Sequence, residues 1–203
     1  MPTTELATIS LKAGSQIGEP NNPAAAVFKD CADTIARQDG FEGMQFDWTS
    51  KSKHEEFMAS PDYGPFFKSF GTIIGGGLSL AHIDFQPEGG ATRAMSAPVT
   101  EVVTFYFEGG PPDDSFESCK KFLETCEKES QQKVYGWAYG TTYEEIEKDG
   151  VKGKGAVLLI GWESRQEHMD FRETDTFKNN IHLLRQTAKG IEMHHTQFMN
   201  FVA

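Results

Sequence analysis

Hydrophobic and polar positions follow two periods along the chain, one typical of β-strands and the other typical of α-helices. Alternating or continuously apolar runs of strand length occur at 6–14, 43–48, 78–85, 100–107, 133–143, 156–162 and 191–201. Each run predicts a β-strand. Between them, apolar residues recur three and four positions apart, as on one face of an amphipathic helix. The pattern therefore predicts an α+β protein in which strands and helices are interleaved.

Capping residues and chain-breaking residues set the expected limits of the helices. Asn22-Pro23 suits a helix start, because Asn is a good cap and Pro fits the first turn. Asp114 and Ser164 each precede a Glu by three positions, which is the capping-box pattern. A fourth helical region begins at Ser50, and Pro61 interrupts it. The three glycines at 75–77 are expected to end that region before the strand at 78–85.

The chain also contains an internal duplication. WTSKSKHEEFMASPDY, beginning at Trp48, matches WESRQEHMDFRETDTF, beginning at Trp162, with an offset of 114 positions and no gap. AHIDF at 81–85 matches HHTQF at 194–198 with an offset of 113. Because both copies of such a repeat must adopt one topology, the duplication constrains the architecture before any single motif is considered.

The second half has the order β-α-β-β-α-β, which is the ferredoxin-like pattern with an antiparallel sheet. The first half has the same order but is shorter, so we expect it to lack one strand. The predicted domains are a first ferredoxin-like module at 5–87, a linker at 88–98 and a second module at 99–203. Each sheet would leave one face bare. We therefore expect the two modules to stack as a pseudo-dimeric α+β barrel within one chain.

Composition and charge limit the classes of partner that this chain is expected to bind. The chain has 203 residues, a net charge of −11 and no local basic cluster. Nucleic acids and anionic membranes are therefore not expected as partners. The three cysteines, Cys31, Cys119 and Cys126, form no CxxC pair, so neither a disulfide framework nor a zinc knuckle is indicated. No long apolar segment or leader pattern is present. We expect a soluble protein of a reducing, cytoplasmic compartment.

The segments DWTSKSKHEEFMASPDYGPFF and GWESRQEHMDFRETDTF resemble the dimeric α+β barrel superfamily. More narrowly, they resemble the antibiotic-biosynthesis-monooxygenase (ABM)-like proteins of fungi in which two modules are fused. The resemblance extends from about residue 5 to 201. It implies one of several activities: cofactor-free oxygenation of aromatic polyketides, polyketide cyclisation, decarboxylation, muconolactone-type isomerisation, or haem-dependent chemistry. Fold alone does not choose among them.

Four histidines are the main candidates for chemistry. His82 and His195 occupy matching places in the closing strands, and alternation puts Asp84 on the same face as His82. A carboxylate at that position would orient an imidazole for acid–base catalysis. His54 and His168 fall in the first turn of matching helices. They are expected either to pack beside the tryptophans as structural residues or to line a substrate pocket.

Aromatic side chains complete the predicted site. Tyr63 is Phe177 in the second copy, so its hydroxyl belongs to the first half alone. It is a candidate for polarising a substrate oxygen, with packing on the helix as the alternative. Trp48, Trp162 and Phe46 are candidate pocket walls, and an ordinary aromatic core is the alternative.

The sequence thus predicts a cofactor-independent enzyme that acts on a hydrophobic, aromatic or polyketide-like small molecule. The catalytic residues would be His82, Asp84, His195 and Tyr63. We expect no metal, because no HxH or HExxH pattern occurs, and no cofactor. A non-catalytic binding or scaffold protein, a haem-binding protein with His82, His168 or His195 as axial ligand, and a homodimer of the chain remain open alternatives.

Overall fold

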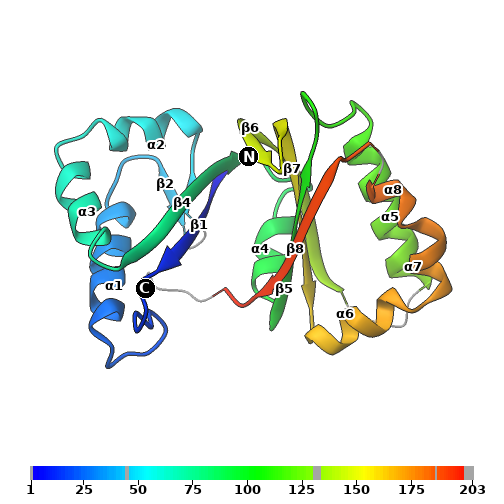
Figure 1. The fold of residues 1–203 in the computed structure, drawn as a ribbon, viewed down its shortest axis with the longest axis horizontal. Coiled ribbons are helices and arrows are strands. Elements are labelled where there is room, and N and C mark those ends of the chain that lie inside the picture. The colour runs from blue at the N-terminus through cyan, green and yellow to red at the C-terminus, as the bar shows by residue number, and fades with distance from the viewer. Residues whose placement is uncertain (1, 44–45, 130–133, 186, 199–203) are drawn as a thin grey trace. The chain divides into compact units, whose positions relative to one another are not determined.

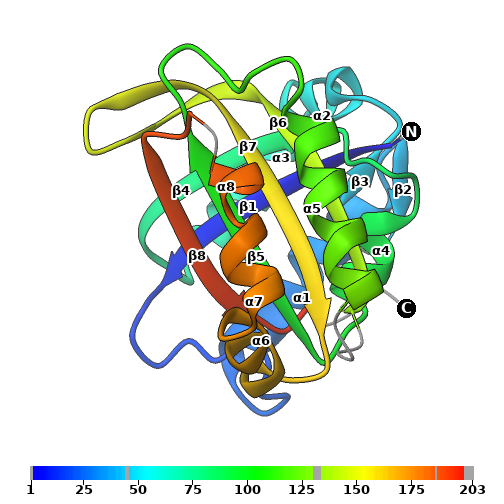
Figure 2. The ribbon, with the colours of Figure 1, turned by 90° about the vertical axis from the view of Figure 1, so that its right-hand side faces the viewer.

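The chain forms two compact units. The computed structural model describes residues 2–43, 46–129, 134–185 and 187–198. The first unit ends at His82, and the second comprises residues 83–198. Each contributes four strands, and Figures 1 and 2 label their elements.

In the first unit, helices cover one face of a small sheet (Figure 1). Its elements are β1 (Thr3–Leu11), α1 (Pro23–Ala36), β2 (Phe41–Gly43), β3 (Asp47–Trp48), α2 (Lys51–Met58), α3 (Tyr63–Phe70) and β4 (Ile74–Ile83). The predicted cap of α1 is confirmed, because the Asn22 side chain accepts a hydrogen bond from the Ala24 N–H. As expected, Pro61 falls between two helices.

The second unit is larger and repeats this plan. Its elements are α4 (Gly90–Met95), β5 (Val99–Tyr106), α5 (Ser115–Glu129), β6 (Val134–Lys148), β7 (Val151–Trp162), α6 (Arg165–Arg172), α7 (Asp175–Asn180), α8 (His182–Arg185) and β8 (Gly190–Thr196). Helices α5, α7 and α8 lie over one face of its sheet, and α4 lies on the other (Figures 1 and 2). The Ser164 side chain caps α6 by accepting from the Glu167 N–H, as predicted.

The strands of the two units follow one order, which confirms the ferredoxin-like prediction. The order is β2-β3-β1-β4 in the first unit and β6-β7-β5-β8 in the second, so each strand has a counterpart. In the second unit β5 pairs antiparallel with β7 and β8, and β6 pairs antiparallel with β7. In the first, β3 pairs antiparallel with β1 and β2.

The expectation that the first half lacks a strand is wrong. Strands β2 and β3 are both present but have 3 and 2 residues, whereas β6 and β7 have 15 and 12. The shorter first half has lost the outer part of the hairpin and kept the paired base, where Phe41 faces Trp48. That base is retained because Trp48 is fully buried in the core of the unit.

The glycines at 75–77 do not break the chain before a strand but lie inside β4. A Cβ atom on Gly75 would lie 2.7 Å from the Lys12 Cα atom, so glycine is required where two backbones approach closely. Similarly, the segment predicted as a connection at 88–98 contains helix α4. Three of its side chains, Ala91, Ala94 and Met95, are buried.

Each unit has an aromatic-rich core. The second unit packs strand residues such as Phe105 and Leu158 against Phe122 of α5. Cys31 and Cys119 are buried free thiols, as expected, and the side chain of Cys126 lies outside the described residues. Within the described part of the chain, no helix combines the length and the apolar character needed to cross a bilayer.

Candidate functional site

Four side chains of the first unit, Glu5, Trp48, His54 and His82, form a cluster that we call the first tetrad. The His54 ring stacks on the Trp48 indole, with ring centres 5.0 Å apart and 23° between the planes. Trp48 Nε1–H donates to Glu5 Oε2 at 3.0 Å, and His54 Nε2 lies 3.5 Å from the same oxygen. His54 Nδ1 lies 2.7 Å from His82 Nε2, so one ring nitrogen donates to the other.

The second unit repeats the arrangement with Glu101, Trp162, His168 and His195, the second tetrad. The His168 and Trp162 rings stack with centres 5.0 Å apart and 19° between the planes. Trp162 Nε1–H donates to Glu101 Oε2 at 3.0 Å, and His168 Nε2 lies 3.4 Å from that oxygen. His168 Nδ1 lies 2.7 Å from His195 Nε2. Both copies have therefore kept a carboxyl that accepts a hydrogen bond from a tryptophan and lies 3.4–3.5 Å from the first of two hydrogen-bonded imidazoles.

The strand register explains why the same four residue types meet twice. Thr3 faces Trp48 across β1 and β3, and Glu5 follows Thr3 by two positions on the same side of its strand. In the second unit Val99 faces Trp162 across β5 and β7, and Glu101 follows by two. Each histidine on a helix lies in the first turn after its tryptophan, close enough to stack on it.

Burial sets the charge of these groups. Burial raises the pKa of Glu5 and that of Glu101 to about 7, against the lowering effect of the tryptophan N–H donors. Burial, with positive charge from His195 and Arg172, lowers the pKa of His168 to about 4. The pKa of His195 is also lowered, mainly by burial. At neutral pH the second tetrad therefore contains neutral imidazoles beside a carboxyl that is close to half protonated.

Three members of the second tetrad, Glu101, Trp162 and His168, border a cavity of about 160 Å³ between the sheet and its covering helices. Most of its wall is apolar, with Phe105 and Leu158 from the strands and Phe122 and Phe177 from the helices among the lining side chains. The polar side chains at the wall are Glu101, His168, Arg172 and Arg185. An apolar cavity with a few convergent polar groups is the usual form of a small-molecule site.

The expected packing of His54 and His168 beside Trp48 and Trp162 is confirmed by the stacked rings. These two histidines are also central members of the tetrads, because each bonds to a closing-strand histidine. His54 and His82 are 5% and 2% exposed, and His168 is 2% exposed. His195 is half-buried.

Asp84 differs from its predicted role. We expected it to orient His82, but the His82 ring faces His54 instead. Asp84 Oδ2 accepts from the Tyr143 hydroxyl at 2.6 Å and lines a separate, polar hollow of about 500 Å³. The reason is that β4 ends at Ile83, so strand alternation no longer governs the next residue.

The other two predicted aromatic residues lie in the core of the first unit. Tyr63 is half-buried and packs against Phe57 and Phe66, with ring centres 5.4 and 5.8 Å away. Burial, followed by the negative charge of Glu5, raises its pKa. Phe46 has a left-handed backbone with a φ of 55° and packs edge-on against Phe41.

The sequence interpretation missed Glu5 and Glu101. The two lie 96 positions apart, not 114. In each half the hairpin lies between the glutamate and the tryptophan, and the hairpin of the first half is shorter. An ungapped comparison therefore does not align them. A signal was present: each first strand carries a Thr-Glu pair, Thr4-Glu5 in one half and Thr100-Glu101 in the other.

This chain has matches among solved structures only. Protein-family models gave no match, and curated proteins gave none either. An anthrone oxidase-like protein matches with a TM-score of 0.63 at 14% identity, covering 100% of this chain and 95% of that one. A proposed monooxygenase of Fusobacterium nucleatum gives 0.55 at 13% identity, with 97% and 91% covered. One of Lactobacillus acidophilus gives 0.50 at 10% identity, with 96% and 92% covered.

At these identities the likeness shows the fold, and it extends over nearly the whole of each chain. The structural neighbours are thus monooxygenase-like and anthrone oxidase-like proteins, as the resemblance in the sequence predicted.

Proposed function

We propose that the second unit is the active site of a cofactor-independent enzyme, which removes a proton from a small aromatic molecule held in its cavity. The observation that carries this proposal is the position of Glu101 and His168 in the wall of an otherwise apolar cavity. A titratable carboxyl facing an apolar space is suited to act on a bound hydrophobic substrate.

The electrostatics of Glu101 support a role as general base. With a pKa of about 7, the carboxyl exists in both forms at neutral pH, which suits transfer of a proton in either direction. His168, held neutral, is 3.4 Å from Glu101 and 2.7 Å from His195 by its other nitrogen. A proton taken by Glu101 would need to cross the 3.4 Å gap to His168 Nε2, from which a hydrogen bond leads on to the half-buried His195.

The cavity also defines the class of substrate. Its volume of about 160 Å³ resembles that of an apolar protein cavity of about 150 Å³ known to bind benzene. One aromatic ring would fill it. Arg172 and Arg185 at the wall supply positive charge, which would stabilise the anion left after the proton is removed.

Among the three reactions that the sequence suggested, we favour oxygenation. The proteins of similar fold are named as monooxygenases and an anthrone oxidase-like protein. An aromatic carbanion can pass electrons to O2 directly, so molecular oxygen would be the co-reactant. In such a reaction a CH2 group attached to the ring becomes C=O, and the second oxygen atom leaves as water. Cyclisation or decarboxylation would begin with the same tetrad.

A non-catalytic binding protein is the second candidate, because each tetrad satisfies its own histidines with neighbouring groups. Haem binding has less support. His82 and His168 are each 2% exposed, and His195 already bonds through Nε2 to His168.

The proposal can be tested with carbon acids that carry a single aromatic ring, the size that fits the cavity. Deuterium exchange from D2O into the acid, followed by NMR, reports proton removal, and an oxygen electrode reports oxygenation. We expect Glu101→Gln to slow exchange about 10²- to 10⁴-fold. The matched control, Glu5→Gln in the first unit, should leave exchange unchanged. Equal rates in wild type and Glu101→Gln, or equal losses in both variants, would contradict the proposal.

A further inference from the structure

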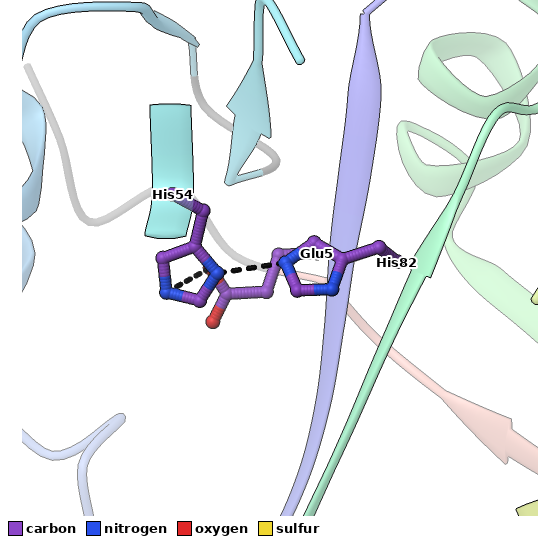
Figure 3. A group of neighbouring side chains, drawn as sticks. All are labelled: Glu5, His54 and His82. Atoms are coloured by element: carbon purple, nitrogen blue, oxygen red, sulfur yellow. Dashed lines mark hydrogen bonds and ion pairs between the residues drawn. The ribbon is translucent and has the colours of Figure 1, made fainter. Parts of the chain in front are cut away.

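The first tetrad contains a set of metal-ligand atoms that the sequence patterns did not reveal. Glu5, His54 and His82 can each offer one ligand atom, and these atoms all lie within 4.8 Å of one another. Within the described part of the chain, this is the one group of three or more His, Cys, Asp or Glu side chains that meets this criterion. Figure 3 shows the side chains pointing toward one another from β1, α2 and β4.

The donor set matches a known coordination chemistry. Two imidazole nitrogens and one carboxylate oxygen bind zinc in several hydrolases and iron(II) in the two-histidine, one-carboxylate oxygenases. Three protein ligands leave at least one position for water or another small ligand. The donors come from different regular elements, which fixes their positions more firmly than a loop would.

The two copies differ in the positive charge placed near the carboxyl. In the second unit the positive charge of Arg172 acts on Glu101. The equivalent position of the first unit, 114 residues earlier, is Met58. The Glu5 side chain is 13% exposed, and this copy lacks that arginine. A divalent ion bound to Glu5 would supply positive charge where the second unit has an arginine.

The surroundings of the ligands resemble the outer shell of a metal site. Trp48 Nε1–H donates to Glu5 Oε2, which orients the carboxylate, and the Trp48 indole stacks on the His54 ring. Such outer contacts hold first-shell ligands in position, and losing one commonly costs 10- to 100-fold in metal affinity. The whole arrangement is buried among Phe57, Trp48 and their neighbours.

We propose that Glu5, His54 and His82 form a binding site for a divalent first-row transition-metal ion in the first unit. The ion would replace the hydrogen bond between the two imidazoles. Their nitrogens, now 2.7 Å apart, would separate to about 3.3 Å, the spacing of two tetrahedral zinc ligands at 2.0–2.1 Å. The inference is independent of the function proposed for the second unit.

The test uses tag-free, full-length protein that has been stripped with a chelator. Zn²⁺ is titrated against a chromophoric chelator, and Co²⁺ is titrated by visible absorbance, which reports coordination by protein nitrogen and oxygen. We expect one equivalent of Zn²⁺ per chain to be withdrawn from the chelator. His82→Gln and Glu5→Gln should abolish this binding and the Co²⁺ absorbance. Trp48→Phe should weaken it about 10- to 100-fold.

The second tetrad supplies the controls, because His195→Gln and Glu101→Gln make the same changes in the other copy. Both should retain one equivalent of Zn²⁺. Circular dichroism identifies variants that fail to fold. If the ligand variants do not fold, the proposal is tested by the metal affinity of Trp48→Phe, which keeps an aromatic ring at that position. The proposal is overturned if folded wild-type protein cannot compete with the chelator. It is equally overturned if all the folded first-tetrad variants bind like wild type, or if the second-tetrad variants lose the ion.

Discussion

At the scale of single residues, the two copies share the contacts within each tetrad but differ in the charge of the residues around it. Both tetrads keep the tryptophan donor, the stacked imidazole and the histidine pair, with matching distances of 3.0 and 2.7 Å. The residues that differ surround them, as Met58 and Arg172 illustrate. The duplication has therefore kept one framework of side-chain contacts and placed different residues around it.

The raised pKa of Glu101 predicts a pH-dependent effect of Glu101→Gln. The folded-state pKa is about 7 and the reference value is 4.5, so above pH 4.5 the folded protein holds a proton that the unfolded chain has lost. Stability from this group is therefore complete below pH 4.5 and disappears as the pH rises through 7. Glutamine stays neutral, so the variant should be more stable than wild type at pH 8.5, by up to about 3 kcal/mol.

The measurement is urea unfolding of both proteins at pH 5 and pH 8.5. At pH 5 the two free energies of unfolding should be similar, because Glu101 is protonated in the folded wild type. The lowered pKa of His168 acts in the opposite direction between pH 4 and 6.5 but is present in both proteins. A stability difference that does not change with pH would refute the assignment.

At the scale of elements, glycine permits close packing that no polar–apolar pattern reveals. Helix α4 lies directly on β6 and β7, and a Cβ atom on Gly161 of β7 would lie 2.8 Å from the Ala94 carbonyl oxygen and 3.0 Å from its Cα atom. Backbone atoms cannot move aside as a flexible side chain does. The short helix with small residues is therefore a packed part of the second unit.

Gly161→Ala should accordingly destabilise the protein by about 1–3 kcal/mol, because it overpacks the contact with α4. Gly77→Ala is the matched control, since Gly77 also lies in a strand but has open space where its Cβ would be. Thermal unfolding followed by circular dichroism measures both. The packing argument fails if the two substitutions have the same effect.

At the scale of the whole molecule, two units use one topology with separate cores. Phe57 and Phe171 are equivalent positions, and each is 3% exposed. Phe57 packs in a cluster with Trp48, whereas Phe171 packs against Trp162 and also lines the cavity. The equivalent positions should therefore contribute alike to stability but differently to ligand binding.

We expect Phe57→Ala and Phe171→Ala each to cost about 3–5 kcal/mol in unfolding free energy. The two clusters share no residue, so the costs should add in the double variant within about 0.5 kcal/mol. Only Phe171→Ala should let larger aromatic fragments stabilise the protein against heat. Phe67→Ala, at a position that is 45% exposed, is the control. Equal binding by both core variants would argue against the cavity as the ligand site.

Sequence patterns predicted the helices and strands more accurately than the contacts between segments that are distant in sequence. The Asn22 and Ser164 caps lie where they were expected, because capping depends on residues within one turn. The glycines at 75–77 were misread as a break, because their use depends on a neighbouring strand that is distant in sequence. The shortened hairpin was misread as a missing strand, because two or three paired residues carry no recognisable period.

The sequence by itself determined the duplication, the ferredoxin-like order of elements and the histidines of both tetrads, because local periodicity and repeated spacing are properties of the chain. Only the tertiary structure decided that Glu5 and Glu101 join those histidines and that Asp84 bonds to Tyr143. It also decided that Glu101 and His168 border a cavity. Strand order and register bring such groups together, and they depend on pairings between residues far apart in the chain.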